Sequence, residues 1–222
     1  MAETDFSIRT FRGGYDNNFT YLVSCMQTGT QFLIDAAISL KRIKPYIRKQ
    51  IDAILITHSH GDHTAYLDET LNEYPEAKYI GYKYLVHKSS KYHLLPLDDR
   101  SRILLGKINI EAIHTPGHFP DSLCYKMENI IFTGDTLFVG RTGRTISAKA
   151  NTMDLYYSVY DKILSLPGNT LIYPGHDYGE KPTISLENNI KISPLLQAES
   201  EKDFIDRMAD YEANRKQNKR RN

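Results

Sequence analysis

The sequence predicts an α/β protein in which two β-sheets pack against each other and helices cover them on the outside. Three observations predict this class. Strand-like stretches followed by a helix-like stretch occur twice along the chain. The hydrophobic share of 41% and the charged share of 25% are those of a globular protein. A chain of 222 residues typically buries roughly 70–75% of its unfolded surface, so it forms a large core without disulfide bonds.

The first half of the chain is predicted to contain four strands and two helices. Ile38–Gln50 and Ala65–Tyr74 place apolar residues near helical spacing. Pro45 interrupts the first of these helices, and Pro75 ends the second because proline disfavours helix at the residue before it. The strands are short runs rich in apolar, β-branched or aromatic residues: Asn18–Ser24, Gln31–Ile34, Asp52–Thr57 and Tyr79–Gly81.

The second half begins with a stretch of mixed composition. Lys83–Leu105 combines Tyr, Lys and Asp, and we expect only a short helix and a loop there. Asp154–Leu164 and Lys202–Lys216 carry apolar residues on one stripe and are predicted to be amphipathic helices. Further strands are predicted where apolar runs recur between turn residues: Ile108–His114, Ser122–Met127, Asn129–Thr133 and Thr170–Tyr173.

We expect one domain over residues 1–210 and a basic, flexible tail over residues 211–222. Five of the last eight residues are Lys or Arg. Such a tail can contact nucleic acid or lipid, or it can be a frayed, solvated end. The formal net charge of +1 gives the chain no general attraction to nucleic acid or anionic lipid, and no apolar run is long enough to cross a membrane. We therefore expect neither a membrane nor a nucleic acid as partner.

Cysteine usage indicates a reducing compartment. Cys25 and Cys124 are far apart and form neither a CxxC clip nor a disulfide framework. The stretch Met1–Phe11 has no apolar segment of the kind found in secretory signals. We expect two reduced thiols and a cytoplasmic location.

The central chemical signal is a run of histidines directly after a predicted buried strand. His58 and His60 are two residues apart, so in an extended segment both face the same side and can reach one metal ion. Asp62 and His63 follow Gly61, where the chain can turn, and are free to face a second point nearby. Imidazole and carboxylate together suit Zn²⁺, Fe²⁺ or Mn²⁺.

Three more segments end a predicted strand in a turn with a ligand-type residue. In each, glycine precedes that residue and lets the side chain project from the sheet edge. Asp35, which ends another apolar run, is either a partner that orients a ligand or a simple turn residue. A single histidine is more often structural than ligating, but seven such residues in four turns predict a metal site: His58, His60, Asp62, His63, His118, Asp135 and His176.

These seven residues resemble the signature of the metallo-β-lactamase superfamily, His-x-His-x-Asp-His followed by a separate His, Asp and His. The resemblance extends from about Phe19 to Met208 and implies a four-layer αββα sandwich of two mixed β-sheets with outer helices. It further implies a ligand assignment in which Asp135 bridges two ions. The first ion would be held by His58, His60 and His118, and the second by Asp62, His63 and His176.

Within the superfamily the chain is similar to the glyoxalase II and persulfide dioxygenase group. The similarity lies in the segments 133–138, 143–144 and 174–178. It implies that Arg144 and Tyr178 contact glutathione. From the residues alone, Arg144 could equally form an exposed salt bridge, and Tyr178 could instead pack in a wall. The stretch after His176 is shorter than the helical domain of glyoxalase II, which favours a persulfide dioxygenase. Ile146-Ser147-Ala148 departs from the Asp-Phe-Gln common in persulfide dioxygenases.

The resemblance implies a metal-dependent hydrolase in which a hydroxide bridging two divalent ions, in the first instance Zn²⁺, cleaves a thioester of the hydroxyacylglutathione type. Asp62 would orient this nucleophile and could accept its proton. The alternative is a persulfide dioxygenase with a single Fe²⁺ held by the equivalents of His58, His118 and Asp135. A nuclease and a non-enzymatic metal-binding module are weaker alternatives. Sixteen tyrosines could supply a homodimer interface.

Overall fold

The computed structural model describes residues 5–85 and 92–221, with side chains described up to residue 215. The first part of the chain forms a six-stranded sheet in the order β1-β2-β3-β4-β5-β6. Its first three strands are antiparallel, and the strands from β3 to β6 are parallel, so the sheet is mixed. The strands are β1 (Phe6–Gly13), β2 (Asn18–Cys25), β3 (Gln31–Ile34), β4 (Ala53–Leu55), β5 (Lys78–Tyr82) and β6 (Leu94–Leu97).

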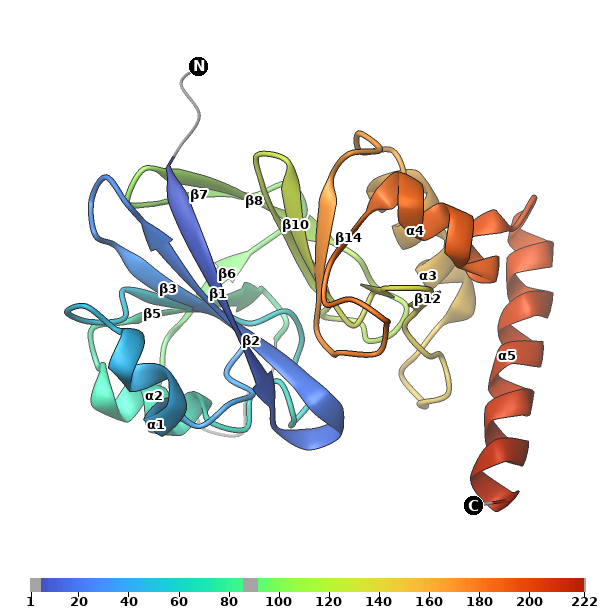
Figure 1. Cartoon of the computed structure of the whole chain (residues 1–222), viewed down its shortest axis with the longest axis horizontal. Coiled ribbons are helices and arrows are strands. Elements are labelled where there is room, and N and C mark those ends of the chain that lie inside the picture. The colour runs from blue at the N-terminus through green and yellow to red at the C-terminus, as the bar shows by residue number, and fades with distance from the viewer. Residues whose placement is uncertain (1–4, 86–91, 222) are drawn as a thin grey trace.

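A second six-stranded sheet follows in the order β14-β13-β10-β9-β8-β7 (Figure 1). Only the pairing of β10 with β13 is parallel among its strand pairs, so this sheet is also mixed. Two short strands, β11 (Leu137–Phe138) and β12 (Arg141–Thr142), form a separate hairpin. The sheet strands are β7 (Arg102–Leu105), β8 (Ile108–His114), β9 (Leu123–Met127), β10 (Ile130–Gly134), β13 (Leu171–Pro174) and β14 (Ile184–Ser185).

The inner faces of the two sheets form the main core. Successive residues of a strand point to opposite faces, so Tyr125 and Phe132 enter this core, whereas Cys124 and Ile131 enter a second core on the far side of the second sheet. Tyr21 of β2 joins the two sheets, with its ring centroid 5.1 Å from that of Phe132. Strands β9 and β10 are therefore buried on both faces.

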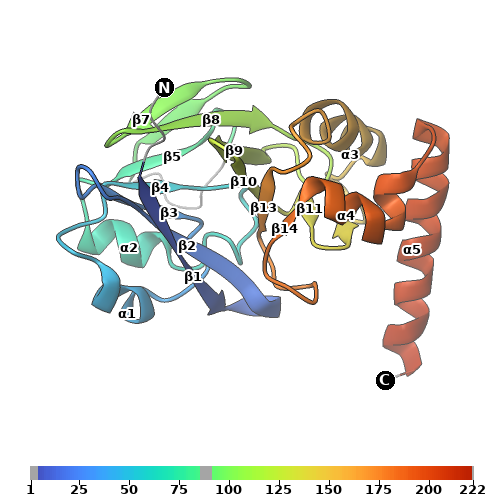
Figure 2. The same ribbon diagram turned by 45° about the horizontal axis from the view of Figure 1, so that its top comes forward.

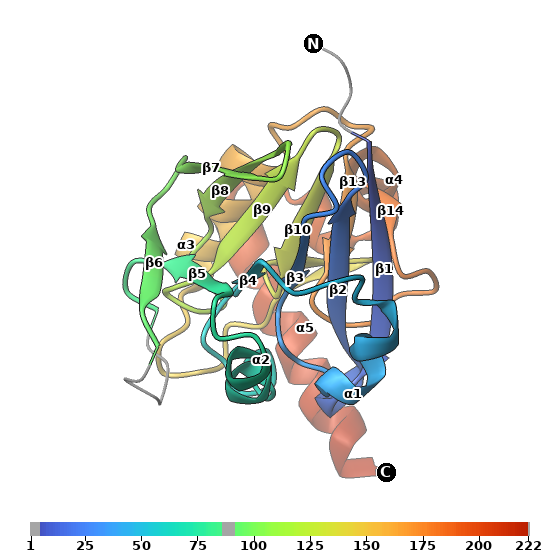
Figure 3. The same ribbon diagram turned by 90° about the vertical axis from the view of Figure 1, so that its left-hand side faces the viewer.

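Helices cover the outer faces of both sheets, which completes the predicted four layers (Figures 2 and 3). Next to the first sheet lie α1 (Leu40–Ile43), the 3₁₀ turn η2 (Lys44–Tyr46) and α2 (Leu67–Glu73). The helices beyond the second sheet pack on its second core. They are α3 (Thr152–Tyr157), which continues as the π-helical segment η3 (Ser158–Ile163), then α4 (Leu186–Ile192), η4 (Pro194–Gln197) and α5 (Glu201–Arg221).

The fold class is confirmed, but several predicted elements are wrong in detail. The single helix over Ile38–Gln50 is replaced by α1 and η2, because Pro45 tightens the chain into a 3₁₀ turn and Ile47 is already extended. The stretch Lys83–Leu105 holds two strands, β6 and β7, in its described part, where a short helix and a loop were predicted. Strands β1 and β14, the hairpin strands β11 and β12, and helix α4 were not predicted either.

The C-terminal helix is longer than predicted, since the backbone of α5 stays helical through Arg221. Two residues near the predicted boundary at 211 contact the body of the protein. Arg141 donates a hydrogen bond to the Tyr211 hydroxyl at 3.0 Å, and Glu212 accepts one from the Thr145 backbone N–H at 2.8 Å. The division into a domain over 1–210 and a tail over 211–222 stays a prediction. No helix in the described part of the chain is long and apolar enough to span a membrane.

Candidate metal centre

The seven ligand-type side chains predicted from the sequence lie together at one edge of the sandwich. The loops that carry them follow four strands, β4, β8, β10 and β13, which come from both sheets. Ligand atoms of these side chains form overlapping groups in which all atoms lie within 4.8 Å of one another. The groups are His58 with His60 and His118, His58 with His63 and Asp135, and Asp62 with His63 and His176.

The first position consists of three imidazoles, His58, His60 and His118. His60 Nδ1 lies 2.9 Å from His58 Nε2 and 3.1 Å from His118 Nε2. The outer nitrogen of His118, Nδ1, donates to the Arg144 carbonyl at 2.8 Å. The outer nitrogen of His58 lies 3.2 Å from Thr57 Oγ1. Because the N–H groups point outwards, the inner nitrogens present lone pairs to a common point.

The second position contains a carboxylate and two imidazoles, Asp62, His63 and His176. The Nε2 atoms of His63 and His176 are 3.3 Å apart, and Asp62 Oδ2 lies 3.4 Å from His176 Nε2. Each imidazole again donates outwards. His63 Nδ1 donates to Asp35 Oδ2 at 2.7 Å, and His176 Nδ1 donates to the Asp16 carbonyl at 2.9 Å. This outward bond fixes the tautomer in which Nε2 can bind a metal ion.

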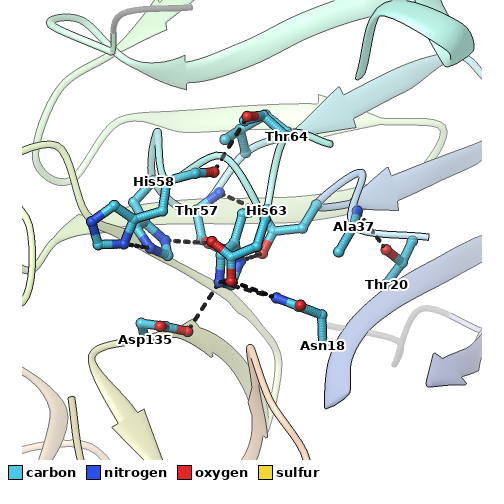
Figure 4. Close-up of polar contacts among 12 residues, drawn as sticks. Asn18, Thr20, Ala37, Thr57, His58, His63, Thr64 and Asp135 are labelled. Atoms are coloured by element: carbon cyan, nitrogen blue, oxygen red, sulfur yellow. Dashed lines mark hydrogen bonds and ion pairs between the residues drawn. The ribbon is translucent and has the colours of Figure 1, made fainter. Parts of the chain in front are cut away.

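Asp135 lies between the two positions. Its Oδ1 is 3.2 Å from His63 Nε2 (Figure 4). Its Oδ2 is 3.5 Å from His118 Nε2 and 3.4 Å from His176 Nε2. The contact of Oδ1 with His63 lacks hydrogen-bond geometry, so this buried oxygen has no hydrogen-bond partner among the described residues. A buried, unpartnered carboxylate oxygen surrounded by imidazole nitrogens fits a bound divalent cation.

The two positions differ in the protonation that their surroundings favour. Burial lowers the pKa of His58, and it lowers that of His60 to about 4. Burial also opposes charge on His63, but Asp135 and Asp35 outweigh it and raise the pKa of His63. Burial is likewise outweighed at His176, where hydrogen bonds to Asp135 and Asp62 raise the pKa to about 9. Without metal, protons therefore neutralise the carboxylates of the second position.

Asp35 connects the two positions through hydrogen bonds. It accepts bonds from the Thr57 N–H and hydroxyl, both at 2.8 Å, besides that from His63. Because the Thr57 hydroxyl donates to Asp35, its oxygen can accept from His58. Asp35 has a φ of 58°, a left-handed conformation that Asp tolerates better than most residues. The structure therefore places Asp35 where the ligand-orienting alternative requires it.

Glycine at position 175 keeps the centre open. A Cβ there would lie 2.5 Å from Asp135 Oδ1 and 2.7 Å from His63 Cε1. Any side chain would therefore occupy the space between these ligands, which explains why a glycine precedes His176.

Two residues near the second position were missed by sequence reasoning. The buried side chain of Asn18 donates to Asp62 Oδ2 at 3.1 Å and lies 3.4 Å from His176 Nε2. Asp16, in the 3₁₀ turn η1 (Tyr15–Asn17), accepts from His176 through its carbonyl. A backbone carbonyl leaves no trace in the sequence, and Asn18 looked only like the first residue of a strand.

The two predicted substrate contacts lie on different sides of the centre. The ring of Tyr178 stacks on His176 at 4.8 Å with an interplanar angle of 2°, and its hydroxyl donates to Asp16 Oδ2 at 2.6 Å. The guanidinium carbon of Arg141 lies 3.8 Å from the Tyr178 ring centroid. The guanidinium of Arg144 makes no hydrogen bond or ion pair with any other described residue.

A cavity of about 580 Å³ lies beside the second position. Tyr178 forms part of its wall, together with the charged side chains of Arg141, Glu180 and Lys181 and the amide of Asn188. This volume lies within the range of about 300–1,000 Å³ that is usual for small-molecule sites. The cavity therefore offers charged and hydrogen-bonding groups around Tyr178, whose ring stacks on His176.

The fold and the cluster together define a class of protein, an α/β sandwich with a His/Asp metal-binding site at one edge of its sheets. Residues 13–176 match the profile of the Metallo-beta-lactamase superfamily. The chain belongs to this superfamily, in its glyoxalase II and persulfide dioxygenase-like group. The resemblance inferred from the sequence is confirmed.

Individual relatives cover most of the chain. "Probable hydroxyacylglutathione hydrolase glo2" of Schizosaccharomyces pombe is 35% identical over 194 residues, which are 82% of this chain and 72% of that protein. "Probable polyketide biosynthesis zinc-dependent hydrolase BaeB" of Bacillus velezensis is 27% identical, covering 85% of this chain and 86% of that protein. The crystal structure of ETHE1 from Myxococcus xanthus has a TM-score of 0.79 and 28% identity, covering 91% of this chain and 90% of that one.

Proposed function

We propose that this metallohydrolase cleaves a thioester whose thiol half is glutathione or a related small thiol. The observation that carries the proposal is the convergence of seven imidazole and carboxylate side chains on two adjacent points. The names of two relatives support it, since one is a hydroxyacylglutathione hydrolase and the other a zinc-dependent hydrolase.

Two divalent ions, in the first instance Zn²⁺ with Fe²⁺ or Mn²⁺ as alternatives, are the proposed cofactors. The first position would hold one ion and the second position the other, with Asp135 contacting both. The donor set of imidazole and carboxylate suits these metals. When bound, such ions supply a hydroxide nucleophile at neutral pH and polarise a carbonyl group.

Asp62 is proposed to orient the attacking oxygen. Burial opposes its charge, but hydrogen bonds with His176 and Asn18 and the nearby His63 keep its pKa below the usual range, so the carboxylate stays ionised. Its side chain is 23% exposed, more than Asp135 at 10%, so it borders the open side of the centre. An ionised carboxylate there can hold the nucleophile by a hydrogen bond and accept its proton.

The thiol half of the substrate is proposed to contact Tyr178 and Arg144, which flank the centre next to His176 and His118 respectively. Arg144 has a guanidinium without an ion pair among the described residues, and a substrate carboxylate would supply one. The cavity of about 580 Å³ beside Tyr178 has room for a tripeptide-sized thiol and groups to hydrogen-bond it. The reaction adds water across the carbonyl–sulfur bond, so the acyl half leaves as a carboxylic acid and sulfur leaves as a thiol.

A mononuclear iron persulfide dioxygenase is the second candidate. It is favoured by the match to ETHE1, in which each chain covers about nine-tenths of the other. The single Fe²⁺ would use His58, His118 and Asp135. The complete second position, with Asp62, His63 and His176 within reach of one another, favours two ions and therefore the hydrolase.

The remaining partners are proposed from charge and composition. The near-neutral net charge argues against a nucleic acid partner. Cys25 and Cys124 are both buried and unpaired, which suits a cytoplasmic location. A homodimer remains a proposal supported only by the tyrosine content.

Metal analysis combined with two substrate types tests the proposal. Protein purified without added metal should contain close to two divalent ions per chain and should hydrolyse S-lactoylglutathione. Activity should disappear on chelation and return with Zn²⁺. One iron per chain, with oxygen uptake on glutathione persulfide and no thioester cleavage, would establish the second candidate instead. His93→Ala is the control, because His93 is exposed and lies outside the cluster.

A further inference from the structure

A second, smaller cavity lies beside the first metal position. Its volume is about 210 Å³, and its walls include Phe119, Tyr82, Tyr84 and Lys149. We propose that this cavity is an acyl subsite, which selects thioesters with an aromatic acyl group. This inference rests on the proposed thioester hydrolysis and names the substrate class of that same site.

Phe119 connects the cavity to the metal centre. It directly follows His118, and its ring centroid lies 4.3 Å from that of His60. Ser59, which also lines the cavity, stands between His58 and His60 in the sequence. A group in the cavity is therefore next to the first position, where the carbonyl of a substrate would lie.

The aromatic wall is held in place on its inner side. Tyr82 is 8% exposed, and its ring stacks on His114 with centroids 3.9 Å apart and an interplanar angle of 6°. Tyr84 meets Tyr82 edge to face at 5.6 Å and remains 70% exposed. Lys149 Nζ lies 5.3 Å from the Phe119 ring centroid. Aromatic rings pair with one another favourably beyond their burial, so this wall favours an aromatic guest.

One acidic group of the cavity wall is already engaged. Asp121 is 5% exposed, and its carboxylate accepts a hydrogen bond from the Ser59 backbone N–H at 3.2 Å. A peptide-like thiol placed here would bury amide groups without enough partners, which is costly. An aromatic ring has no such requirement.

The sizes of the two cavities indicate which half of the substrate each cavity would bind. The cavity of about 580 Å³ beside Tyr178 is large and has the charged side chains of Arg141, Glu180 and Lys181 among its apolar walls, whereas the cavity of about 210 Å³ beside Phe119 lies below the usual range for a whole ligand. Tyr178 of the large cavity stacks on His176, and Phe119 of the small cavity lies beside His60. A thioester bound across the centre would place its thiol half in the large cavity and its acyl group in the small one.

Binding of unreactive thioethers tests the subsite directly. S-benzylglutathione and S-methylglutathione share the thiol half and differ in the group that would occupy the small cavity. Calorimetry on the metal-loaded protein should give a dissociation constant about tenfold lower for S-benzylglutathione. Phe119→Ser and Tyr84→Ala should each reduce this ratio to below about threefold. Tyr46→Ala, which removes a half-exposed tyrosine remote from the centre, should keep it.

Hydrolysis separates failure of this inference from failure of the proposed function. The ratio of kcat/KM for S-phenylacetylglutathione over S-acetylglutathione should exceed about ten in the parent protein and fall in Tyr84→Ala, whose exposed side chain can be removed without opening the core. Cleavage of both thioesters with no preference, and equal binding of the two thioethers, would overturn the subsite and leave thioester hydrolysis standing. A metal-loaded protein that cleaves neither thioester would overturn both.

Discussion

The first and second metal positions use the same kinds of side chain but differ in where negative charge lies. The first position has three imidazoles and borders the ring of Phe119. The second position includes Asp62 and is supported by Asp35. As a result, burial lowers the histidine pKa values on one side, whereas carboxylates raise them on the other. Similar sets of ligands can therefore differ before a cation binds. The histidines of one position are neutral, whereas those of the other carry protons that the cation must displace.

Removing the residue shared by both positions should have the largest effect. Asp135→Ala takes a carboxylate away from each, so both ions should be lost and kcat/KM should fall on the order of 10³-fold or more. Metal content and thioester hydrolysis measure this. Asp161→Ala, at an exposed aspartate, is the matched control. Full activity of Asp135→Ala at unchanged metal content would contradict the bridging role.

A change that weakens the second position more than the first should make the two ions differ in affinity. Asp35→Asn keeps a carbonyl oxygen for Thr57 but opposes an amide donor to the N–H of His63. Loss of such a supporting carboxylate typically lowers metal affinity about 10–100-fold. Dialysis followed by metal analysis should leave about one ion per chain. The control is Asp52→Asn, since Asp52 also accepts a hydrogen bond from a backbone N–H but lies just before β4, away from the metal ligands. Retention of both ions would show that Asp35 does not support metal binding.

The two positions should also differ in proton release. At pH 7 the raised pKa values keep His63 and His176 protonated in the metal-free protein, so binding of the second ion must displace protons. His58 and His60 are neutral at this pH and release none. Calorimetry in two buffers of different ionisation enthalpy should detect this release at pH 7 and less of it above pH 9, where His176 has lost its proton. Release of equal numbers of protons on binding of each ion would contradict the proposed difference between the two positions.

The same shifts predict how the stability of the metal-free protein depends on pH. A raised histidine pKa stabilises the fold fully below about pH 6.5, and this contribution disappears as pH rises through the folded value of about 9 at His176. The lowered pKa of His60 has the opposite effect, because it reduces the free energy of unfolding as pH falls from about 6.5 towards 4. Urea unfolding of the metal-free protein should therefore give a maximum near neutral pH, which metal loading should flatten.

The smallest effect is expected at the edge of the second position. Tyr178→Phe removes the hydrogen bond to Asp16 but keeps the ring stacked on His176. The change should cost about 1 kcal/mol or less in affinity for the second ion. Tyr157→Phe, which loses a hydroxyl bond to Glu201 on the surface, is the matched control. Complete loss of the second ion in Tyr178→Phe would mean that the hydroxyl, not the ring, holds His176.

The strands that could be predicted and those that could not differ in position. Central strands such as β4, β9 and β10 are apolar on both faces, so their short hydrophobic runs are recognisable. Within the two six-stranded sheets, the missed strands β1, β6, β7 and β14 are the four edges. Edge strands are half exposed, and β6 even contains Pro96, which excludes a central strand. Edge strands are therefore harder to predict from local composition than central strands.

The ligands were predictable for a different reason from their supporting groups. His58, His118, Asp135 and His176 stand in turns at strand ends, where their residue type and spacing are visible in one dimension. The contribution of Asp16 is a backbone carbonyl, which every residue has. That of Asn18 depends on β2 meeting the loop after β13, a contact between residues far apart in sequence. Only the folded chain brings such groups together.

The meeting of β2 with the loop after β13 has a mechanical consequence. The Phe19 N–H donates to the Gly175 carbonyl at 2.8 Å, and Asn18 pairs with His176, so the two sheets are joined beside the metal ligands. Each ion would be coordinated from both halves of the sandwich, because the loop after β4 belongs to one sheet and those after β8, β10 and β13 to the other. Bound metal would then act as a cross-link, slowing separation of the halves in a protein whose two thiols form no such bond.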